Sequence, residues 1–237
     1  MFIADKDELA AADFQAGVTV LVDKPLHWTS FDVVNKIRFA LKKKLKVRKI
    51  KVGHAGTLDP LATGLLIIAI GKDTKTLEDY QAMYKVYTGS MRLGATTKSY
   101  DYEFEPDNFF PVSHIDEELL ERARQDFIGI IEQVPPKYSA IKIKGEAAYK
   151  LARRGEDFQM KKRKVEIFRF DFDKIALPDI EFTVKCQKGT YIRSLVHDFG
   201  AALDSGAYMT ALQRIAIGQY KLENAFALDE IITAISD

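Results

Sequence analysis

The amino-acid sequence predicts an α+β fold with a central, mostly antiparallel mixed sheet flanked by helices. Strand-like and helix-like patterns follow one another in irregular order, whereas a parallel α/β sheet requires regular alternation. The longest apolar run, Leu65–Ile70, has the length of one buried strand and is far too short to span a membrane. No internal repeat and no Gly/Ser linker interrupts the 237 residues. We therefore predict a single domain over residues 1–237.

The elements are assigned from apolar periodicity and from residues that start or stop helices. Along the chain they are a strand at 17–22, a helix at 29–41, strands at 65–70 and 85–93, a loop at 100–112, a helix at 117–127, an extended segment at 134–140, a helix at 146–154, strands at 165–172 and 181–187, a helix at 191–203, a strand at 212–220 and a helix at 229–235. Thr29 and Asp32 have the spacing of a capping box at the start of the first helix. Pro135 and Pro136 lack the amide proton that a helix needs, which keeps their segment extended.

Charge is balanced overall but uneven along the chain. Lys and Arg total 35 against 34 Asp and Glu, a formal net charge of +1, which excludes a uniformly basic nucleic-acid binder. Between Lys42 and Lys51, however, there are seven basic residues and no acid, and Lys161–Lys164 forms a second basic cluster. Such patches are compatible with phosphate contacts and equally with a solvated face.

The single cysteine and the N-terminus bear on the compartment. Cys186 cannot form an internal disulfide, which is consistent with a reducing compartment, and its alternating surroundings predict that it is buried. The first 14 residues carry acids and alanines instead of the basic-then-apolar order of a secretory signal. We therefore expect a cytoplasmic protein that makes no membrane contact.

The segment Gly53–Gly64 is the strongest candidate for a functional site. Its three glycines permit tight turns and the close approach of a ligand. Asp59 precedes Pro60, which pushes the backbone of Asp59 out of the helical region and so pre-positions its carboxylate. Such an aspartate could serve as a nucleophile or a general base. The alternative is that Asp59 caps a turn, with Pro60 as the first residue of a helix.

Five motifs in this chain resemble, in family order, the signature of the TruB family of pseudouridine synthases. Gly53-His-Ala-Gly-Thr-Leu-Asp-Pro-Leu-Ala-Thr-Gly64 matches every fixed position of the family pattern G-H-x-G-x-L-D-P-x-A-x-G. The other four are Leu21–Pro25 with Ser30, Tyr84–Val86 followed by Arg92–Gly94, Pro136–Ala140 with Lys144 and Gly145, and Lys188–Arg193. Two positions depart from the family: His27 stands where a glycine is usual, and Leu212-Gln-Arg214 replaces an arginine-rich pair.

The resemblance implies the pseudouridine synthase fold and an isomerase that converts uridine 55 in the T-loop of tRNA to pseudouridine. Asp59 is then the essential aspartate, which attacks the ribose or the base, or first abstracts a proton, so that the base detaches and reattaches through carbon. The target base must be flipped out of its stack, and no cofactor is expected because the isomerisation has no redox change. The resemblance also implies a single catalytic domain with a thumb-like insertion at about 134–160 and without the C-terminal PUA domain of many members.

Three further residues match active-site positions of the family. Arg193 matches the arginine that pairs with the catalytic aspartate, and an ordinary surface ion pair is the alternative. Tyr84 matches the active-site tyrosine, whose ring can stack on the flipped base, and a half-buried strand tyrosine is the alternative. Tyr191 is a second motif tyrosine, assigned to the substrate-binding set, and is expected to position Arg193 or to pack beneath it.

The remaining substrate-binding assignments come from three motifs. His54 matches the family histidine that fills the gap left by the flipped base, and a hydrogen bond within its loop is the alternative. Gly56 allows close approach in the same motif, Lys24 is expected to brace the active-site loop, and Lys144 belongs to the thumb-like insertion. Candidate phosphate contacts are Lys42, Lys43, Lys44, Lys49 and Lys51 in a basic loop, and Lys142, Lys144, Lys150, Arg153 and Arg154 in the insertion.

Alternative functions and partners remain open. The chain is either an enzyme or an RNA-binding protein that helps tRNA fold, and the presence of Asp59, Tyr84 and Arg193 favours the enzyme because a chaperone needs no nucleophile. A guide-dependent synthase is disfavoured, because such relatives use the PUA domain. We expect a monomer that acts on the T-stem-loop of tRNA without guide RNA. No metal is expected, because the histidines share no metal-ligand spacing.

Overall fold

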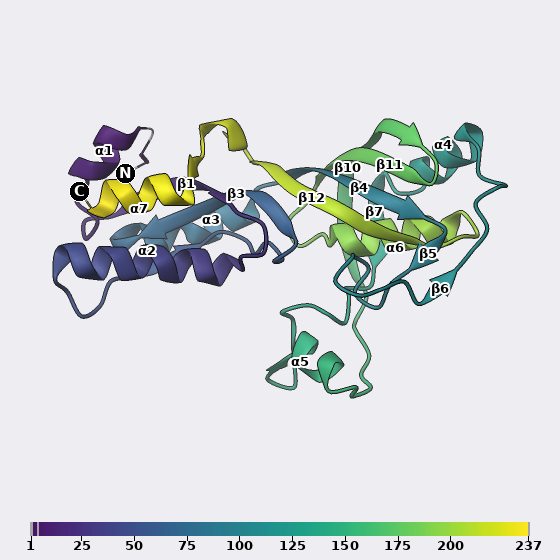
Figure 1. Ribbon diagram of the computed structural model, residues 1–237, viewed down its shortest axis with the longest axis horizontal. Coiled ribbons are helices and arrows are strands. Elements are labelled where there is room, and N and C mark those ends of the chain that lie inside the picture. The colour runs from purple at the N-terminus through teal and green to yellow at the C-terminus, as the bar shows by residue number, and fades with distance from the viewer. Residues whose placement is uncertain (1, 4, 237) are drawn as a thin grey trace. The chain divides into compact units, whose positions relative to one another are not determined.

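The computed structural model describes residues 2–3 and 5–236, which form two compact units (Figure 1). Unit 1 comprises Met1–Tyr87 and Leu212–Asp237, and unit 2 comprises Thr88–Ala211. Strands β4 (Lys85–Leu93) and β12 (Ala207–Ile217) contribute residues to both units.

Unit 1 is built on a sheet in which β1 and β3 are the central strands. The strand order is β14-β1-β3-β12, with β2 also paired to β3 and β13 to β12. The bounds are β1 (Val18–Lys24), β2 (Val52–His54), β3 (Ala62–Ile70), β13 (Tyr220–Lys221) and β14 (Phe226–Ala227). β1 runs antiparallel to β3, with Lys24 opposite Gly64, whereas β12 runs parallel to β3. The sheet is therefore mixed.

Apolar side chains cover both faces of β3, which explains its unbroken apolar sequence. Leu66, Ile68 and Ile70 join the larger hydrophobic cluster, and Leu65 and Ile67 join a smaller one. The helices of the larger cluster are α1 (Lys6–Ala11), α2 (Ser30–Leu45) and α7 (Leu228–Ser236). Helix α3 (Leu77–Ala82) follows a 3₁₀ segment (Gly71–Thr76) and packs against the smaller cluster through Leu77 and Tyr80. A second 3₁₀ turn, Leu222–Asn224, precedes β14.

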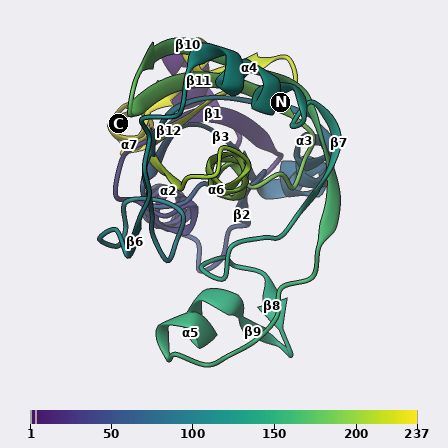
Figure 2. The same cartoon turned by 90° about the vertical axis from the view of Figure 1, so that its right-hand side faces the viewer.

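Unit 2 has a sheet of order β4-β11-β10-β7. Its strands are β7 (Gly129–Gln133), β10 (Arg163–Ala176) and β11 (Asp179–Cys186), beside the residues of β4, and its main helices are α4 (Glu117–Gln125) and α6 (Ile192–Ala202). Phe199 of α6 packs edge-on against Phe170 of β10, with ring centroids 5.7 Å apart. Figure 2 shows α6 nearly end-on within this unit. Cys186 is buried, as the alternating pattern predicts.

A small lobe projects from unit 2 inside the range expected for the thumb-like insertion. It contains β8 (Lys142–Ile143), β9 (Glu146–Ala147) and α5 (Ala148–Arg153). Figures 1 and 2 both show this lobe standing apart from the other strands and helices of its unit. A second small ribbon in unit 2 pairs β5 (Ala95–Thr96) with β6 (Asn108–Phe109), so the expected loop at 100–112 contains a two-residue strand.

The predicted α+β architecture with a mostly antiparallel sheet is confirmed, and the differences lie at element ends. The first major helix continues to Leu45, so Lys42–Lys44 are helical and not part of a loop, because lysine favours helices and cations stabilise a helix C-terminus. The strand expected at 212–220 runs from Ala207 to Ile217, since Gly218 adopts a φ of +54° and reverses the chain into β13.

Three further differences concern the bounds of two helices and one additional strand. The helix expected at 146–154 starts only at Ala148, because Glu146 and Ala147 pair with β8 as a strand. The helix expected at 117–127 ends at Gln125. β7 has no counterpart among the predicted elements, and it is held by its pairing with β10.

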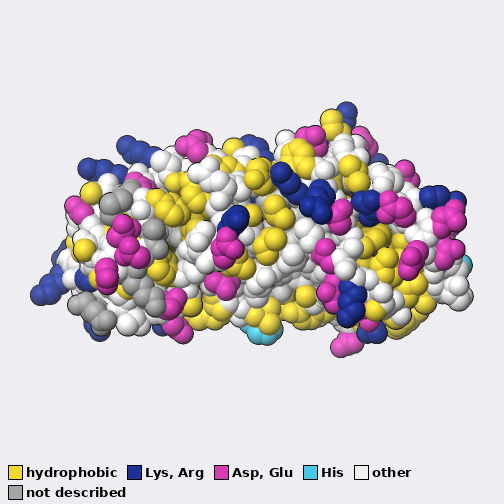
Figure 3. Space-filling model, turned by 90° about the horizontal axis from the view of Figure 1, so that it is seen from above, with side chains coloured by type: hydrophobic (Ala, Val, Ile, Leu, Met, Phe, Trp, Pro, Cys, Tyr) yellow, Lys and Arg dark blue, Asp and Glu magenta, His cyan; other side chains and the backbone are white. Residues whose placement is uncertain are grey.

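Within residues 2–3 and 5–236, no helix is both long and apolar enough to cross a membrane. Figure 3 shows one face of the molecule, on which basic, acidic and hydrophobic side chains are interspersed. That mixture agrees with the formal net charge of +1.

Candidate active site

The loop between β2 and β3 carries Asp59 and is held at several points within unit 1. The amide of Leu58 donates to Ser30 Oγ at 2.8 Å, and this hydroxyl lies 3.2 Å from the Leu58 carbonyl, to which it donates. The Pro60 carbonyl accepts from the amide of His27 at 2.8 Å, and the Asp59 carbonyl accepts from the amide of Ala62 at 3.1 Å. Asp59 is thus flanked on both sides by anchored residues.

The alternative in which Pro60 begins a helix is wrong. Residues 60 and 61 form a turn that leads directly into β3. The carboxylate of Asp59 therefore stands on a short turn between two strands, half-buried and braced from behind by the buried residues of β3.

Three buried cations, Lys24, Lys85 and Arg214, lie in the same unit as Asp59. Lys24 is fully buried, and its ammonium donates to the carbonyls of Pro25 and Trp28 at 2.9 and 2.6 Å. Burial lowers the pKa of Lys24 to about 8, while the nearby negative charge of Asp59 opposes that shift. Lys24 therefore presents a poorly solvated positive charge to the Asp59 carboxylate. The expected role of bracing the Asp59 loop stays a prediction, because the Lys24 ammonium donates to Pro25 and Trp28.

Arg214, another of the buried cations, lies in the segment that departs from the family pattern. Its Nε donates to the Leu65 carbonyl at 2.7 Å and its Nη2 to the Gly56 carbonyl at 3.0 Å. Gly56 has a φ of +92°, in the left-handed region that favours glycine. Arg214 thus fixes the start of the Asp59 loop, and no local pattern in its strand signals this.

His54 lies at the end of β2, one residue before that loop turns. Burial and the positive charge of Arg214 lower its pKa, against the effect of a hydrogen bond with the Gly56 backbone. Its Nδ1 is buried and makes no hydrogen bond to the described residues. A neutral, planar imidazole of this kind can stack on a base, and both the stacking role and the hydrogen bond within its loop stay predictions.

Tyr84 stands immediately before β4, and its carbonyl accepts from the amide of Gly218 at 2.9 Å. It is 38% exposed. Its backbone is therefore fixed in unit 1 while part of its ring remains accessible, and this agrees with either assignment made from the sequence.

In unit 2 the candidate arginine is buried and not a surface residue. Arg193 is 3% exposed, and its guanidinium donates to the carbonyls of Ser99 and Tyr138 at 3.0 and 2.9 Å. Its Nη1 lies 3.5 Å from a carboxylate oxygen of Asp101, which is also buried. The surface-pair alternative is therefore wrong, and the pairing of Arg193 with Asp59 stays a prediction.

Asp101 was missed by sequence reasoning, because it is one of many acids in residues 101–126. Its carboxylate accepts from Ser99 Oγ at 2.5 Å and from the amide of Glu103 at 3.0 Å. The intervening Tyr100 has a φ of +66° and its ring stacks on His197, with centroids 3.8 Å apart. α6 thus holds residues 99–101 through Arg193 and His197, one helical turn apart.

Tyr191 directly precedes α6 and is held by Gln133. The Gln133 side chain accepts from the Tyr191 amide at 2.8 Å and donates to its carbonyl at 3.0 Å. The guanidinium of Arg163 lies 4.5 Å from the centre of the Tyr191 ring. These contacts orient the start of the helix that carries Arg193.

Lys144 lies on the projecting lobe, at the turn between β8 and β9. It is exposed and has a φ of +49°, followed by Gly145 with a φ of +93°. Within the lobe, Arg154 pairs with Glu146 at 2.7 Å. Among the described residues, no group of three or more His, Cys, Asp and Glu side chains is placed to hold a metal ion.

Comparisons with known proteins show the family to which the chain belongs. The family model described as TruB family pseudouridylate synthase (N terminal domain) matches residues 42–192, and the tRNA pseudouridylate synthase B C-terminal domain matches residues 193–236. A relative named tRNA pseudouridine synthase B from Phocaeicola vulgatus is 51% identical over 217 residues, which cover 92% of each chain. One of the same name from Flavobacterium johnsoniae is 50% identical, covering 90% of this chain and 93% of the relative.

Solved structures are similar over almost the whole chain. A structure described as a Cbf5-Nop10-Gar1 complex has a chain that matches with a TM-score of 0.70 and 29% identity, covering 94% of this chain and 56% of that one. An H/ACA RNP bound to a substrate RNA containing 2'-deoxyuridine matches with a TM-score of 0.66 and 27% identity, covering 93% and 53%. The chain thus spans just over half the length of these solved chains.

The matched residues extend from 42 to 236 and contain Asp59, Tyr84 and Arg193. The α+β architecture with its mixed sheet agrees with the fold that the motifs imply. The chain belongs to the TruB family of pseudouridylate synthases, which are isomerases.

Proposed function

We propose that this chain converts uridine 55 in the T-loop of tRNA to pseudouridine, with Asp59 as the attacking carboxylate and without a cofactor. The observation that carries the proposal is the setting of Asp59, on a turn clamped through Ser30 and close to the buried ammonium of Lys24. Relatives about half identical over nine tenths of the chain bear the name tRNA pseudouridine synthase B, which supports tRNA as the substrate.

The reaction transfers the ribose C1′ from N1 to C5 of the same uracil. The C1′–N1 bond breaks, a C1′–C5 bond forms, C5 loses a proton and N1 carries one at the end. Asp59 acts by attack on the ribose or the base, or by abstracting a proton first. Attraction by the Lys24 charge orients the carboxylate for this attack.

The other residues receive roles from the motifs they match. Tyr84 stacks on the flipped base, neutral His54 fills the gap that this base leaves, and Arg193 pairs with the catalytic carboxylate. We propose that residues 134–160 form a thumb that grips the RNA, with Lys144 exposed at its tip. The protein acts as a cytoplasmic monomer without guide RNA.

The decisive experiment uses unmodified tRNA transcript labelled with tritium at C5 of uridine. The full chain should release tritium from position 55, and Asp59→Asn should reduce release at least about 10⁴-fold while keeping RNA affinity within about threefold. Asp126→Asn, at an exposed helix end, serves as the control and should match the unmodified protein.

Three outcomes would count against the proposal. Tight T-loop binding without tritium release would assign the protein to RNA folding. Release only after addition of a guide RNA would contradict guide independence. Full release by Asp59→Asn would remove this residue from the chemistry.

A further inference from the structure

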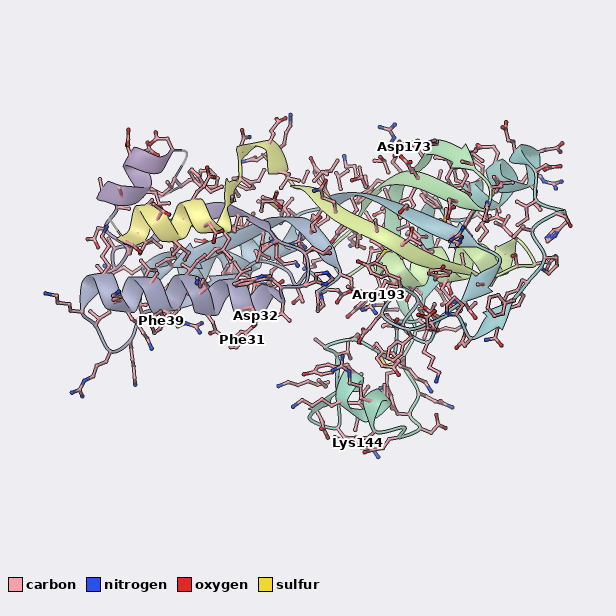
Figure 4. All side chains as sticks on the ribbon, in the orientation of Figure 1. Phe31, Asp32, Phe39, Lys144, Asp173 and Arg193 are labelled. Carbon is pink, nitrogen blue, oxygen red and sulfur yellow. The ribbon has the colours of Figure 1, made fainter. Side chains whose placement is uncertain are left out.

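One face of α2 exposes two large aromatic side chains. Phe31 is 60% and Phe39 71% exposed, although burial of a phenylalanine is strongly favourable. Figure 4 shows both rings projecting from the same side of α2, away from the strands of unit 1. The core face of the helix is already filled by Val33, Ile37 and Leu41 and others, so these rings contribute nothing to packing of the sheet.

The same face carries positive charge. The guanidinium of Arg38 lies 6.0 Å from the centre of the Phe31 ring and donates to the side chain of Asn35 and the carbonyl of Val52 at 2.6 and 2.9 Å. Positions 31, 35, 38 and 42 follow helical spacing, which places Lys42 in line with Arg38, and Lys46 caps the end of the helix.

The single acid of α2 does not neutralise this face. The Asp32 carboxylate accepts from the amide and hydroxyl of Thr29 at 2.9 and 2.6 Å, which completes the capping box. These hydrogen bonds lower the pKa of Asp32, so its charge serves the helix N-terminus. From Phe39 to Lys51 the chain has no acid at all.

The first turn of α2 lies beside the loop that carries Asp59, inside unit 1. Ser30, the first residue of α2, makes both hydrogen bonds to Leu58, the neighbour of Asp59. Phe31 follows directly, and the helix then extends for 16 residues, about 24 Å at 1.5 Å per residue. An RNA strand leaving Asp59 could follow this helix toward the basic residues at its end.

We propose that Phe31, Phe39 and the cations between and beyond them form an RNA-binding face, which holds unpaired nucleotides of the same RNA whose uridine reaches Asp59. Aromatic side chains interleaved with basic ones are the usual platform for unpaired bases, which stack while phosphates contact the cations. Protein interfaces are depleted in lysine, which argues against a protein as the occupant. The inference rests on the proposed function only in that the substrate is RNA.

The test measures RNA affinity in the catalytically silent Asp59→Asn chain, so that turnover does not alter the ligand. The probes are the unmodified tRNA transcript and a fully paired RNA duplex of equal length. Phe39→Ala and Phe31→Ala should each raise Kd for the transcript about tenfold and for the duplex less than twofold. Phe39→Trp should retain or improve affinity, because the larger ring still stacks. Lys42→Gln should lower the salt slope of log Kd by about 1.

The control is Phe109→Ala, which removes a 78% exposed phenylalanine from unit 2 and should leave both affinities unchanged. Unchanged transcript affinity in Phe31→Ala and Phe39→Ala would overturn the proposal and leave a protein partner as the reason for the exposed rings. Equal losses on transcript and duplex would overturn the assignment to unpaired nucleotides. Thermal unfolding checks the fold of each variant, and the midpoint should not fall.

Tritium release by the Asp59 forms of the same variants separates this inference from the proposed function. If the unmodified protein isomerises uridine 55 while Phe39→Ala binds RNA normally, the proposed RNA-binding face on α2 is wrong and the proposed function is supported. If no uridine is isomerised but Phe39→Ala loses affinity, the function is wrong and the α2 face stands.

Discussion

In unit 1 the buried cations are held by backbone carbonyls, whereas in unit 2 the buried cation Arg193 has the buried carboxylate of Asp101 beside it. Lys24 and Arg214 donate hydrogen bonds to neutral backbone carbonyls, and the acid whose charge acts most strongly on Lys24 is the half-buried Asp59. Arg193 has a carboxylate oxygen of Asp101 3.5 Å away and donates from Nη1 and Nη2 to the backbone of two loops.

This difference separates two uses of buried charge. In unit 1, burial of the charged Lys24 lowers the stability of the fold, and its positive charge attracts the carboxylate of the half-buried Asp59. In unit 2, the Arg193–Asp101 pair fixes the positions of residues 99–101 and of Tyr138 at the base of the projecting lobe. We therefore expect unit 1 to gain stability when Lys24 is replaced by an apolar side chain. We expect unit 2 to lose stability when the Arg193–Asp101 pair is broken.

The largest effect is expected when the pair in unit 2 is broken. Asp101→Ala leaves Arg193 buried without its carboxylate and should lower the free energy of unfolding by about 3–5 kcal/mol, measured by chemical denaturation. The double variant Asp101→Ala/Arg193→Met should recover part of the loss. Asp179→Ala, which breaks the exposed pair with Arg92, is the control and should cost less than about 1 kcal/mol. Equal losses in Asp101→Ala and the control would contradict the comparison.

Replacement of Lys24 by methionine is expected to have the opposite effect, a rise in the free energy of unfolding. The folded pKa of Lys24, about 8, lies below its ordinary value of 10.5, so the unfolded chain binds more protons between these pH values. Stability should therefore rise as pH increases from 8 to 10.5, and below pH 8 a constant penalty of about 3 kcal/mol remains. Lys24→Met should remove the penalty and flatten this part of the pH profile.

The same variant should lose activity while it gains stability. Without the Lys24 charge, the Asp59 carboxylate loses its nearby cation, and kcat should fall by about tenfold or more. Chemical denaturation at pH 7 to 10 and tritium release at pH 7 measure the two effects. A Lys24→Met protein that is less stable than its parent at pH 7 would show that the packing of the lysine stem outweighs the cost of burying its charge.

The smallest expected effect on stability comes from loosening the Asp59 loop itself. Ser30→Ala leaves the buried amide of Leu58 without its acceptor and should cost about 1–2 kcal/mol. Because the clamp positions Asp59, kcat should fall while KM changes little. Ser236→Ala, which removes an exposed helix-end hydroxyl, is the control. An unchanged kcat would mean that the remaining anchors suffice.

Sequence reasoning succeeded where the signals are local. The capping box at Thr29 and Asp32 is present as predicted, and β4 spans Lys85–Leu93 with the predicted bounds. The Gly53–Gly64 motif does form a turn between strands with Asp59 at its centre. Strands of two or three residues such as β2, β5 and β8 were missed, because they are too short to show alternation and exist only through their partners.

His27 occupies the position at which the family usually has a glycine. His27 stands there with a φ of +66°, and its amide donates to the Pro60 carbonyl. The backbone geometry that favours glycine is therefore kept in this chain with a different residue, at a cost of roughly 1–2 kcal/mol. The departure seen in the sequence leaves the hydrogen bond to the Asp59 loop in place.

By itself, the sequence determined the fold class, the main helices and strands, and the family, because apolar periodicity, caps and contiguous motifs are local properties of the chain. Only the tertiary structure decided that Arg214 anchors Gly56 and Leu65, and that Arg193 meets Asp101. The physical reason is that these side chains are held by groups some 90 to 160 positions away along the chain. Whether a charge is buried or solvated depends on such distant partners, and no spacing within a motif records them.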